Sequence, residues 1–261
     1  MQPDLEKRAI RAAFGNAASR YDSVAHVQRR IADALLARCS VTTGIALDVG
    51  SGTGYAANRL RALSASSVAL DHASPMLSAF EGAAVCGDIE ALPVRDASIG
   101  LYYSSLAWQW TNTERAIAEA ARVLQPGGAL AVASLAPGTF KELRHAFRRA
   151  DDAEHVRQFV PTERYLPQLT AAGFESIEIS CAEFVIYASD LRTMLHDIKA
   201  LGAHVVGQPR RPGLFGVQAF RRAESYYRSL REEAGLPLTY EAVFITARRQ
   251  ATTCATTKYP I

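Results

Sequence analysis

The segment ALDVGSGTGYAANRL, residues 46–60, decides the fold of this chain. An apolar run reaches an acid, Asp48, and three glycines follow at alternate positions, Gly50, Gly52 and Gly54. Glycines in a turn between a strand and a helix let the backbone pass close to a ligand and leave free N–H groups at the helix N-terminus. An acid beside the loop would repel a pyrophosphate, so the loop favours a cationic ligand that carries an amino group and a sulfonium.

The overall composition is that of an ordinary globular protein. Of the 261 residues, 49% are hydrophobic and 21% are charged. We therefore expect a single domain over residues 1–250, followed by a loose tail at 251–261 that lacks any periodicity. No run of about 18 apolar residues occurs, and the N-terminus carries acids and no apolar signal region, so we expect a cytoplasmic protein without membrane contact.

Cysteine, histidine and charge patterns exclude several other classes. The four cysteines and six histidines are dispersed without zinc spacing, so neither a disulfide framework nor a metal site is predicted. The net charge of +3 is too small to indicate nucleic-acid binding. Basic residues are concentrated at 199–231, where seven Lys or Arg stand against one Glu. No feature indicates assembly, so a monomer is the working expectation.

Short apolar runs alternate with helical patterns, as in parallel α/β sheets. The first five runs predict strands at 45–49, 67–71, 83–87, 99–104 and 128–135. Two longer strand patterns follow, at 176–188 and 238–249. These patterns predict an α/β fold with a mostly parallel seven-stranded sheet and helices on both of its faces.

Additional helical patterns flank this sheet. Residues 5–38 form one such pattern, within an N-terminal helical segment at 1–40. A helical insertion at 189–235 separates the last two strands, with helices near 189–201 and 216–234. Ser189 or Asp190 can cap the first of these helices, and prolines and glycines predict a loop at 207–213.

Acids also follow the second and third predicted strands. Asp71 ends the second strand, where a carboxylate can accept hydrogen bonds from both hydroxyls of a ribose. Asp88 and Ile89 follow the third strand, and they offer a carboxylate to an exocyclic amine and an apolar side chain to a purine face. Each acid alone could be a cap or turn residue. Three acids at three successive strand ends indicate a nucleoside site.

The motifs DVGSGTG, LD before SPM, GDIEALP and LQPGGALAVAS resemble those of class I S-adenosylmethionine-dependent methyltransferases. The resemblance covers residues 45–135 and implies a Rossmann-like fold, S-adenosyl-L-methionine as co-substrate and no metal. It implies that Asp48 and the glycines hold the methionine part, Asp71 the ribose, and Asp88 with Ile89 the adenine. The full set of cofactor-binding residues expected on this basis is Asp48, Gly50, Ser51, Gly52, Gly54, Asp71, His72, Met76, Asp88, Ile89 and Ser105.

Outside this core, the chain resembles the malonyl-acyl-carrier-protein O-methyltransferases of biotin synthesis. The resemblance rests on AFGNAASRYDSVAHVQRRIADALL (13–36), SSLAWQWTN (104–112), LRTMLHDIKALGA (191–203) and PLTYEAVF (237–244). It implies methylation of the free carboxylate of malonyl-acyl carrier protein, or malonyl-CoA, to the ester that primes pimeloyl synthesis. Two alternatives share the cofactor motifs: a methyltransferase for another small carboxylic acid or a quinone, and an assembly factor that binds the cofactor without methyl transfer.

A carboxylate acceptor simplifies the chemistry that the chain must supply. With a pKa near 4, it is ionised at neutral pH, so no catalytic acid or base is predicted. The site must instead orient the acceptor and exclude water. SSLAWQW follows the fourth strand, so Trp108 and Trp110 could close the site and Gln109 could donate a hydrogen bond. An extended segment would point only one of Trp108 and Trp110 inward, and the alternative is that either packs the sheet against a helix.

The flanking helices hold the other candidates for positioning the substrate. Tyr21 and Gln28 are seven residues apart and would share a face if both lie on one helix. Tyr21 could bind a substrate or cofactor carboxylate or be purely structural. Arg192, His196 and Lys199 form a basic stripe. Arg192 could pair with the malonyl carboxylate, or the stripe could be a solvated face. The wider basic segment is expected to dock an acidic carrier protein. Its arginines are Arg210, Arg211, Arg221, Arg222, Arg228 and Arg231.

Overall fold

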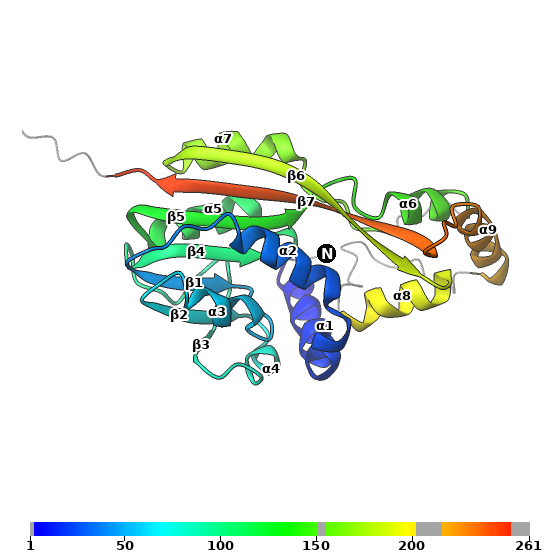
Figure 1. Ribbon diagram of the computed structural model, residues 1–261, viewed down its shortest axis with the longest axis horizontal. Coiled ribbons are helices and arrows are strands. Elements are labelled where there is room, and N and C mark those ends of the chain that lie inside the picture. The colour runs from blue at the N-terminus through cyan, green and yellow to red at the C-terminus, as the bar shows by residue number, and fades with distance from the viewer. Residues whose placement is uncertain (1–2, 151–154, 202–215, 252–261) are drawn as a thin grey trace, which may run out of the picture.

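A seven-stranded sheet forms the centre of the computed structural model, which describes residues 3–150, 155–201 and 216–251 (Figure 1). The strand order is β3-β2-β1-β4-β5-β7-β6. Strands β1 to β5 pair in parallel, and β7 runs antiparallel to both β5 and β6. The strands are β1 (Ile45–Val49), β2 (Ser66–Asp71), β3 (Ala83–Cys86), β4 (Ile99–Ser105), β5 (Leu124–Leu135), β6 (Phe174–Ala188) and β7 (Leu236–Arg249).

Two apolar clusters cover the two faces of this sheet. Helices α2 (His26–Leu36) and α3 (Tyr55–Leu60) pack into one cluster. Helices α5 (Thr113–Val123) and α7 (Tyr165–Ala171) pack into the other. Because both faces are covered, the central strands are mostly apolar and almost continuously buried, as β1 and β4 illustrate. Three short helices complete the connections: α4 (Ser74–Leu77), η1 (Trp108–Trp110) and η2 (Thr162–Arg164).

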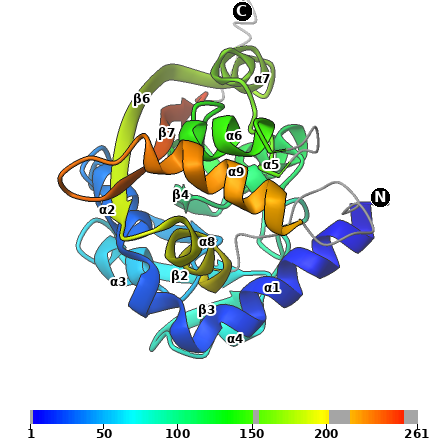
Figure 2. The ribbon, with the colours of Figure 1, turned by 90° about the vertical axis from the view of Figure 1, so that its right-hand side faces the viewer.

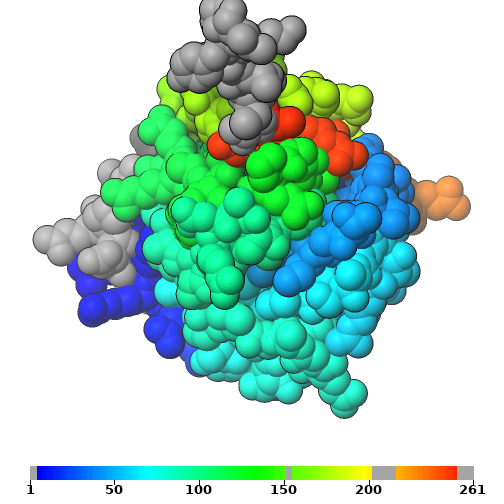
Figure 3. Space-filling view, turned by 90° about the vertical axis from the view of Figure 1, so that its left-hand side faces the viewer, coloured from blue at the N-terminus to red at the C-terminus, as the bar shows by residue number. Residues whose placement is uncertain are grey.

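The remaining helices gather at the carboxyl edge of the sheet. Helix α1 (Pro3–Val24) crosses this edge and contacts α4 and α8. Strands β6 and β7 extend past the other strands and hold α6 (Lys141–Arg148), α8 (Leu191–Ala200) and α9 (Val217–Arg228) on the same side (Figures 1 and 2). Seen from the opposite end, the surface is formed mainly by the cyan-to-green segment that contains β1 to β5 (Figure 3).

The fold class predicted from the sequence is confirmed, with local differences. The N-terminal helical pattern breaks at Ala25, which is buried, so two helices replace one. Strand β5 begins four residues earlier than its apolar run, at Leu124. Helix α9 ends at Arg228 because the next residues turn toward β7, with a glycine at φ 130°, Gly235. Asp190 is the residue that caps α8, since its carboxylate accepts a hydrogen bond from the Thr193 N–H at 2.8 Å.

Some sequence predictions concern residues outside the described ranges. The predicted loop at 207–213, together with Arg210 and Arg211, lies outside the described residues. So does nearly all of the predicted tail, residues 252–261. Within the described ranges, no helix combines the length and apolar character needed to cross a membrane.

Candidate functional site

The glycine loop lies between β1 and α3, against the segment that follows β4. Gly50 has a φ of 73°, and a Cβ at this position would lie 2.2 Å from the Cβ of Ala107. No other residue type fits there without moving the backbone. Gly54 has a φ of 83° and begins α3, but it packs against the ring of Phe80. The loop thus brings the ends of two neighbouring strands into contact.

Two adjoining cavities open around this loop. The larger cavity encloses about 780 Å³ and the smaller about 480 Å³ of empty space, part of it open to solvent. The same five residues line both cavities and mark where they meet: Tyr21, Gly50, Gly52, Ser105 and Leu106. The loop and the end of β4 therefore form the floor of a continuous site.

In the larger cavity, the carboxylates have protein partners. Asp71 accepts hydrogen bonds from the N–H groups of Gly52, at 2.9 Å, and Ala73, at 2.8 Å. Asp88 accepts one from the N–H of Glu90, at 2.9 Å, and lies 2.7 Å from the ammonium of Lys7. Burial alone would raise the pKa of Asp88, but these two partners hold it below its usual range. The predicted residues His72, Met76 and Ile89 also line this cavity.

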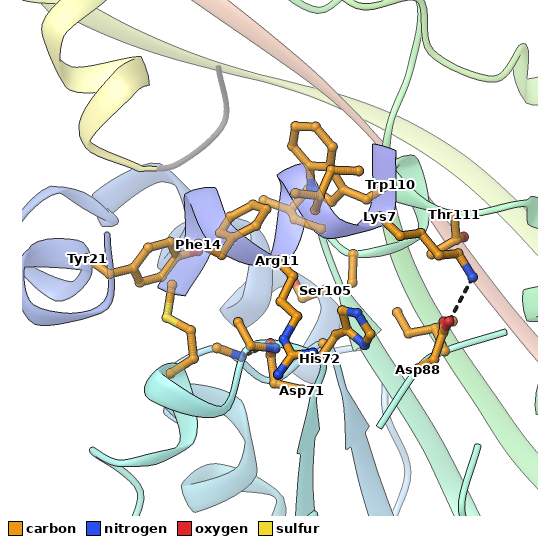
Figure 4. A pocket seen from close by; sticks show the side chains of 18 residues that line it. Lys7, Arg11, Phe14, Tyr21, Asp71, His72, Asp88, Ser105, Trp110 and Thr111 are labelled. Carbon is orange, nitrogen blue, oxygen red and sulfur yellow. Dashed lines mark hydrogen bonds and ion pairs between the residues drawn. The ribbon is translucent and has the colours of Figure 1, made fainter. Parts of the chain in front are cut away.

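Helix α1 covers the larger cavity with side chains that the sequence interpretation did not select. Lys7, Ile10, Arg11 and Phe14 all line it (Figure 4). Lys7 also lies 2.9 Å from Glu90, and Arg11 extends toward Asp71 and His72. Their spacing of i, i+3, i+4 and i+7 places them on one helical face, and this was the signal available in the sequence.

The smaller cavity has the opposite character, because polar atoms on its walls are left without partners. Asp48 is 2% exposed, and its Oδ2 has no hydrogen-bond partner among the described residues. The same holds for three other buried atoms of its lining: Gln28 Oε1, Arg29 Nε and Ser51 Oγ. Burial raises the pKa of Asp48 to about 7. A polar ligand with both donors and acceptors would therefore satisfy these buried atoms.

Tyr21 lines both cavities. Figure 4 shows its side chain at the larger one. Burial raises its pKa, and the nearby carboxylates of Asp71 and Asp22 raise it further. The hydroxyl therefore keeps its proton at neutral pH and can donate a hydrogen bond. Gln28 lies on α2 and Tyr21 on α1, so the two do not share a face of one helix, although both line the smaller cavity.

The predictions for Trp108 and Gln109 as pocket residues are wrong. Trp108 is fully buried, and its Nε1 donates to the hydroxyl of Tyr102 at 3.2 Å. The Gln109 amide is engaged within the protein, since its Nε2 donates to the Leu106 carbonyl at 2.7 Å and its Oε1 accepts from Ser134. The segment forms a short 3₁₀ turn and not an extended strand, so its side chains fan out in different directions.

Trp110 is the tryptophan that faces the larger cavity. Its ring meets Phe14 of α1 edge to face, with centroids 5.5 Å apart. The guanidinium of Arg157 lies 5.2 Å from the same ring and also pairs with Glu6 of α1 at 2.7 Å. Trp110 therefore joins the end of β4 to the helix that covers the site.

The basic stripe of α8 does not reach the cavities. Arg192 and Lys199 are exposed and line neither of them, and Arg192 lies 5.5 Å from the ring of Phe220 on α9. His196 is exposed beside Asp197. The apolar face of α8, with Leu191 and Met194, is the one that packs inward, so the basic face points to solvent. The prediction that Arg192 or Lys199 contacts the malonyl carboxylate is not supported by this arrangement.

Comparisons with known proteins agree with this geometry. Residues 47–132 match the family model described as a methyltransferase domain. The malonyl-[acyl-carrier protein] O-methyltransferase of Dechloromonas aromatica is 42% identical over 248 residues, covering 93% of this chain and 95% of that protein. The same enzyme of Laribacter hongkongensis is 38% identical, covering 94% and 90%. A SAM-dependent methyltransferase from Thermotoga maritima has a similar fold, with a TM-score of 0.57 and 16% identity over 92% of this chain and all of that one.

Proposed function

Because the chain belongs to the malonyl-[acyl-carrier protein] O-methyltransferase family, we propose that it methylates the free carboxylate of a malonyl group on acyl carrier protein or coenzyme A. The methyl donor of this S-adenosylmethionine-dependent class is S-adenosyl-L-methionine. The observation that carries the proposal is the pair of adjoining cavities, which present carboxylates from three successive strand ends to one elongated ligand. A relative from Cellvibrio japonicus, named a biotin biosynthesis bifunctional protein, supports a role in that pathway.

The residues present fit this methyl donor. In the larger cavity, Asp71 would accept the ribose hydroxyls, and Asp88 would accept the adenine amine while Ile89 covers the ring. Met76 and His72 would complete the walls. In the smaller cavity, the unpaired oxygens of Asp48 and Gln28 would receive the ammonium of the amino-acid group. The point where the nucleoside meets the amino-acid group of the methyl donor would lie above Gly50, Ser51, Gly52 and Ser105. Gly54 serves the turn itself, since it lines neither cavity.

The transfer asks the protein for orientation and not for proton transfer. S-adenosylmethionine supplies, when bound, a methyl group on a positively charged sulfur. Holding an ionised carboxylate in line with that methyl can lower the barrier by about 7 to 11 kcal/mol. Phe14, Leu106 and Trp110 provide apolar walls that exclude water from the approach. The Tyr21 hydroxyl, which keeps its proton, can donate to the incoming carboxylate at the junction of the cavities.

A direct assay tests the proposed reaction. Malonyl-acyl carrier protein, malonyl-CoA and a panel of other small acids and quinones would be incubated with methyl-labelled S-adenosylmethionine. We expect a base-labile methyl ester on a malonyl thioester. Labelling of another acid or quinone alone would identify a different acceptor. Cofactor binding without S-adenosylhomocysteine formation from any acceptor would instead favour a non-methylating assembly factor.

Exposed basic residues support docking of an acidic carrier protein on α8 and α9. Arg192, Lys199, Arg221 and Arg228 are exposed there, on the side of the molecule that holds α1. Complementary charge mainly raises the encounter rate and is weakened by salt. Arg221→Glu should therefore lower activity on malonyl-acyl carrier protein, as added salt should, while activity on malonyl-CoA changes less. Equal effects on both substrates would contradict this docking surface.

The cytoplasmic location and the monomeric state expected from the sequence stay predictions.

A further inference from the structure

We propose that Arg29 of α2 binds the α-carboxylate of the methyl donor, so that α2 distinguishes a complete amino-acid group from one that lacks its carboxylate. This inference rests on the proposed function and deepens it. Arg29 lies outside the residues that match the methyltransferase domain, 47–132, and no sequence pattern singled it out. The unpaired polar atoms of the smaller cavity carry the argument.

The guanidinium of Arg29 is held in place by two contacts. It lies 5.1 Å from the centroid of the Tyr55 ring. Its Nη2 lies 3.0 Å from Oδ1 of Asp22, which also accepts a hydrogen bond from the Thr53 hydroxyl at 2.8 Å. A planar group fixed by a ring and a carboxylate has a defined orientation before any ligand binds. Within the described part of the chain, its buried Nε finds no acceptor.

The four unpaired atoms of the smaller cavity match an α-amino acid. Arg29 Nε is a donor and the Ser51 hydroxyl can donate, whereas Asp48 Oδ2 and Gln28 Oε1 are acceptors. An α-amino acid brings the complementary set, a carboxylate that accepts and an ammonium that donates. Arg29 is the cationic side chain among the described residues that line this cavity, so it is the counter-charge available to a carboxylate.

The alternative role for Arg29 is purely structural, as the partner of Asp22. Asp22 is half exposed at its side chain, and an ion pair in that setting adds little stability. A structural role would make the loss of Arg29 equally harmful to every ligand of the site. A carboxylate contact would make the loss depend on whether the ligand has a carboxylate.

The test compares two ligands that differ only in that carboxylate. Calorimetry would measure the binding of S-adenosylhomocysteine and of its decarboxylated analogue, 5′-deoxy-5′-(3-aminopropylthio)adenosine, to the wild type and to Arg29→Gln. We expect Arg29→Gln to weaken S-adenosylhomocysteine about 10- to 100-fold and the decarboxylated analogue by less than about twofold. Arg29→Lys, which keeps the charge without the planar group, should fall between the wild type and Arg29→Gln for S-adenosylhomocysteine.

Arg59→Gln is the matched control. Arg59 stacks on the same Tyr55 ring, at 3.6 Å, but pairs with Asp33 and lines neither cavity, so its loss should leave both affinities unchanged within about twofold. Equal weakening of both ligands by Arg29→Gln, or no weakening of S-adenosylhomocysteine, would overturn the assignment of Arg29 and leave the proposed function intact. A wild-type protein that binds neither ligand would overturn the proposed function and this inference with it.

Discussion

The larger and smaller cavities present their polar groups in opposite states. In the larger cavity, Asp71 and Asp88 already have backbone or ammonium partners. In the smaller cavity, Asp48 and three other polar side chains keep buried atoms without partners. In the larger cavity, a ligand must therefore share carboxylates that already have hydrogen-bond partners. In the smaller cavity, it supplies partners to polar atoms that have none among the described residues. Binding free energy should thus depend more strongly on the polar contacts of the smaller cavity.

The largest effect is expected from Asp48→Asn. This change keeps the shape of the side chain but removes the charge that would face the ligand's ammonium, so S-adenosylhomocysteine should bind about 30- to 100-fold more weakly. Asp71→Asn, measured by the same calorimetry, should cost about tenfold or less, because the ribose hydroxyls it would lose are neutral partners. A larger loss for Asp71→Asn than for Asp48→Asn would contradict the contrast between the cavities.

The next effect is a pH dependence of binding. Burial raises the pKa of Asp48 to about 7 in the ligand-free protein, and an ammonium beside it favours the ionised form. Below pH 7, binding must release the proton of Asp48, so affinity for S-adenosylhomocysteine should fall by up to about tenfold per pH unit and level off above pH 7. Calorimetry in two buffers of different ionisation enthalpy would detect the released proton. In Asp48→Asn the dependence should disappear; a slope that persists there would assign it to another group.

The two tryptophans allow a matched test of position. Trp108 is buried in the core and bonded to Tyr102, so Trp108→Phe should lower the free energy of unfolding by about 1 to 3 kcal/mol. Trp110 lines the larger cavity, so Trp110→Phe should lower kcat/KM for methyl transfer about 3- to 10-fold with little loss of stability. Thermal unfolding and steady-state kinetics of both variants would check this. The reverse assignment of the two effects would contradict the observed 3₁₀ turn.

The smallest effect is expected from Lys7→Met. Lys7 ties α1 to Asp88 and Glu90 over the larger cavity, and under the proposed binding mode it would also compete with adenine for Asp88. These two consequences oppose each other in affinity, so Kd should change only about two- to threefold. Ligand exchange, followed by stopped-flow fluorescence, should become faster and lose part of its salt dependence because the ion pair no longer has to break.

The neighbouring residue supplies the control for this last variant. Arg8 is exposed on the same turn of α1 and lines neither cavity. Arg8→Met should therefore leave the exchange rate and its salt dependence as in the wild type. If both variants behave alike, Lys7 does not hold α1 over the site.

The strands, and the acids proposed to hold the methyl donor, could be predicted from the sequence. In a parallel sheet, the carboxyl ends of neighbouring strands meet at one edge, so an acid at the end of a strand pattern is placed once the strand is recognised. Asp71 and Asp88 line the larger cavity and Asp48 the smaller for this reason. Their partners could not be predicted, because Lys7 reaches Asp88 from 81 positions away in the chain.

The residues that would position the methyl acceptor were predicted less well, because their orientation depends on local details of the turn and the helices. Whether Trp108 or Trp110 faces the cavity depends on a turn that starts after Leu106, at a φ of 58°, which periodicity does not reveal. For α8, the pattern separated an inward apolar face from a basic stripe and left open whether the stripe binds the substrate or is solvated. The structure buries Leu191 and Met194 and leaves Arg192 exposed, so the solvated alternative fits. On α1, the spacing of Lys7, Ile10, Arg11 and Phe14 indicates one helical face, but only the position of α1 over the strand ends makes that face part of the site.

The break at Ala25 has a consequence for the length of the ligand. Helix α1, before the break, contributes five residues to the larger cavity, Tyr21 among them, and α2, after it, contributes Gln28 and Arg29 to the smaller one. A nucleoside in the larger cavity would contact α1 alone, whereas an amino acid in the smaller cavity would contact α2 together with Tyr21 and Asp22 at the end of α1. Only a molecule long enough to occupy both cavities would contact the two helices along the whole site. The break at Ala25 therefore makes full enclosure of the ligand depend on its length.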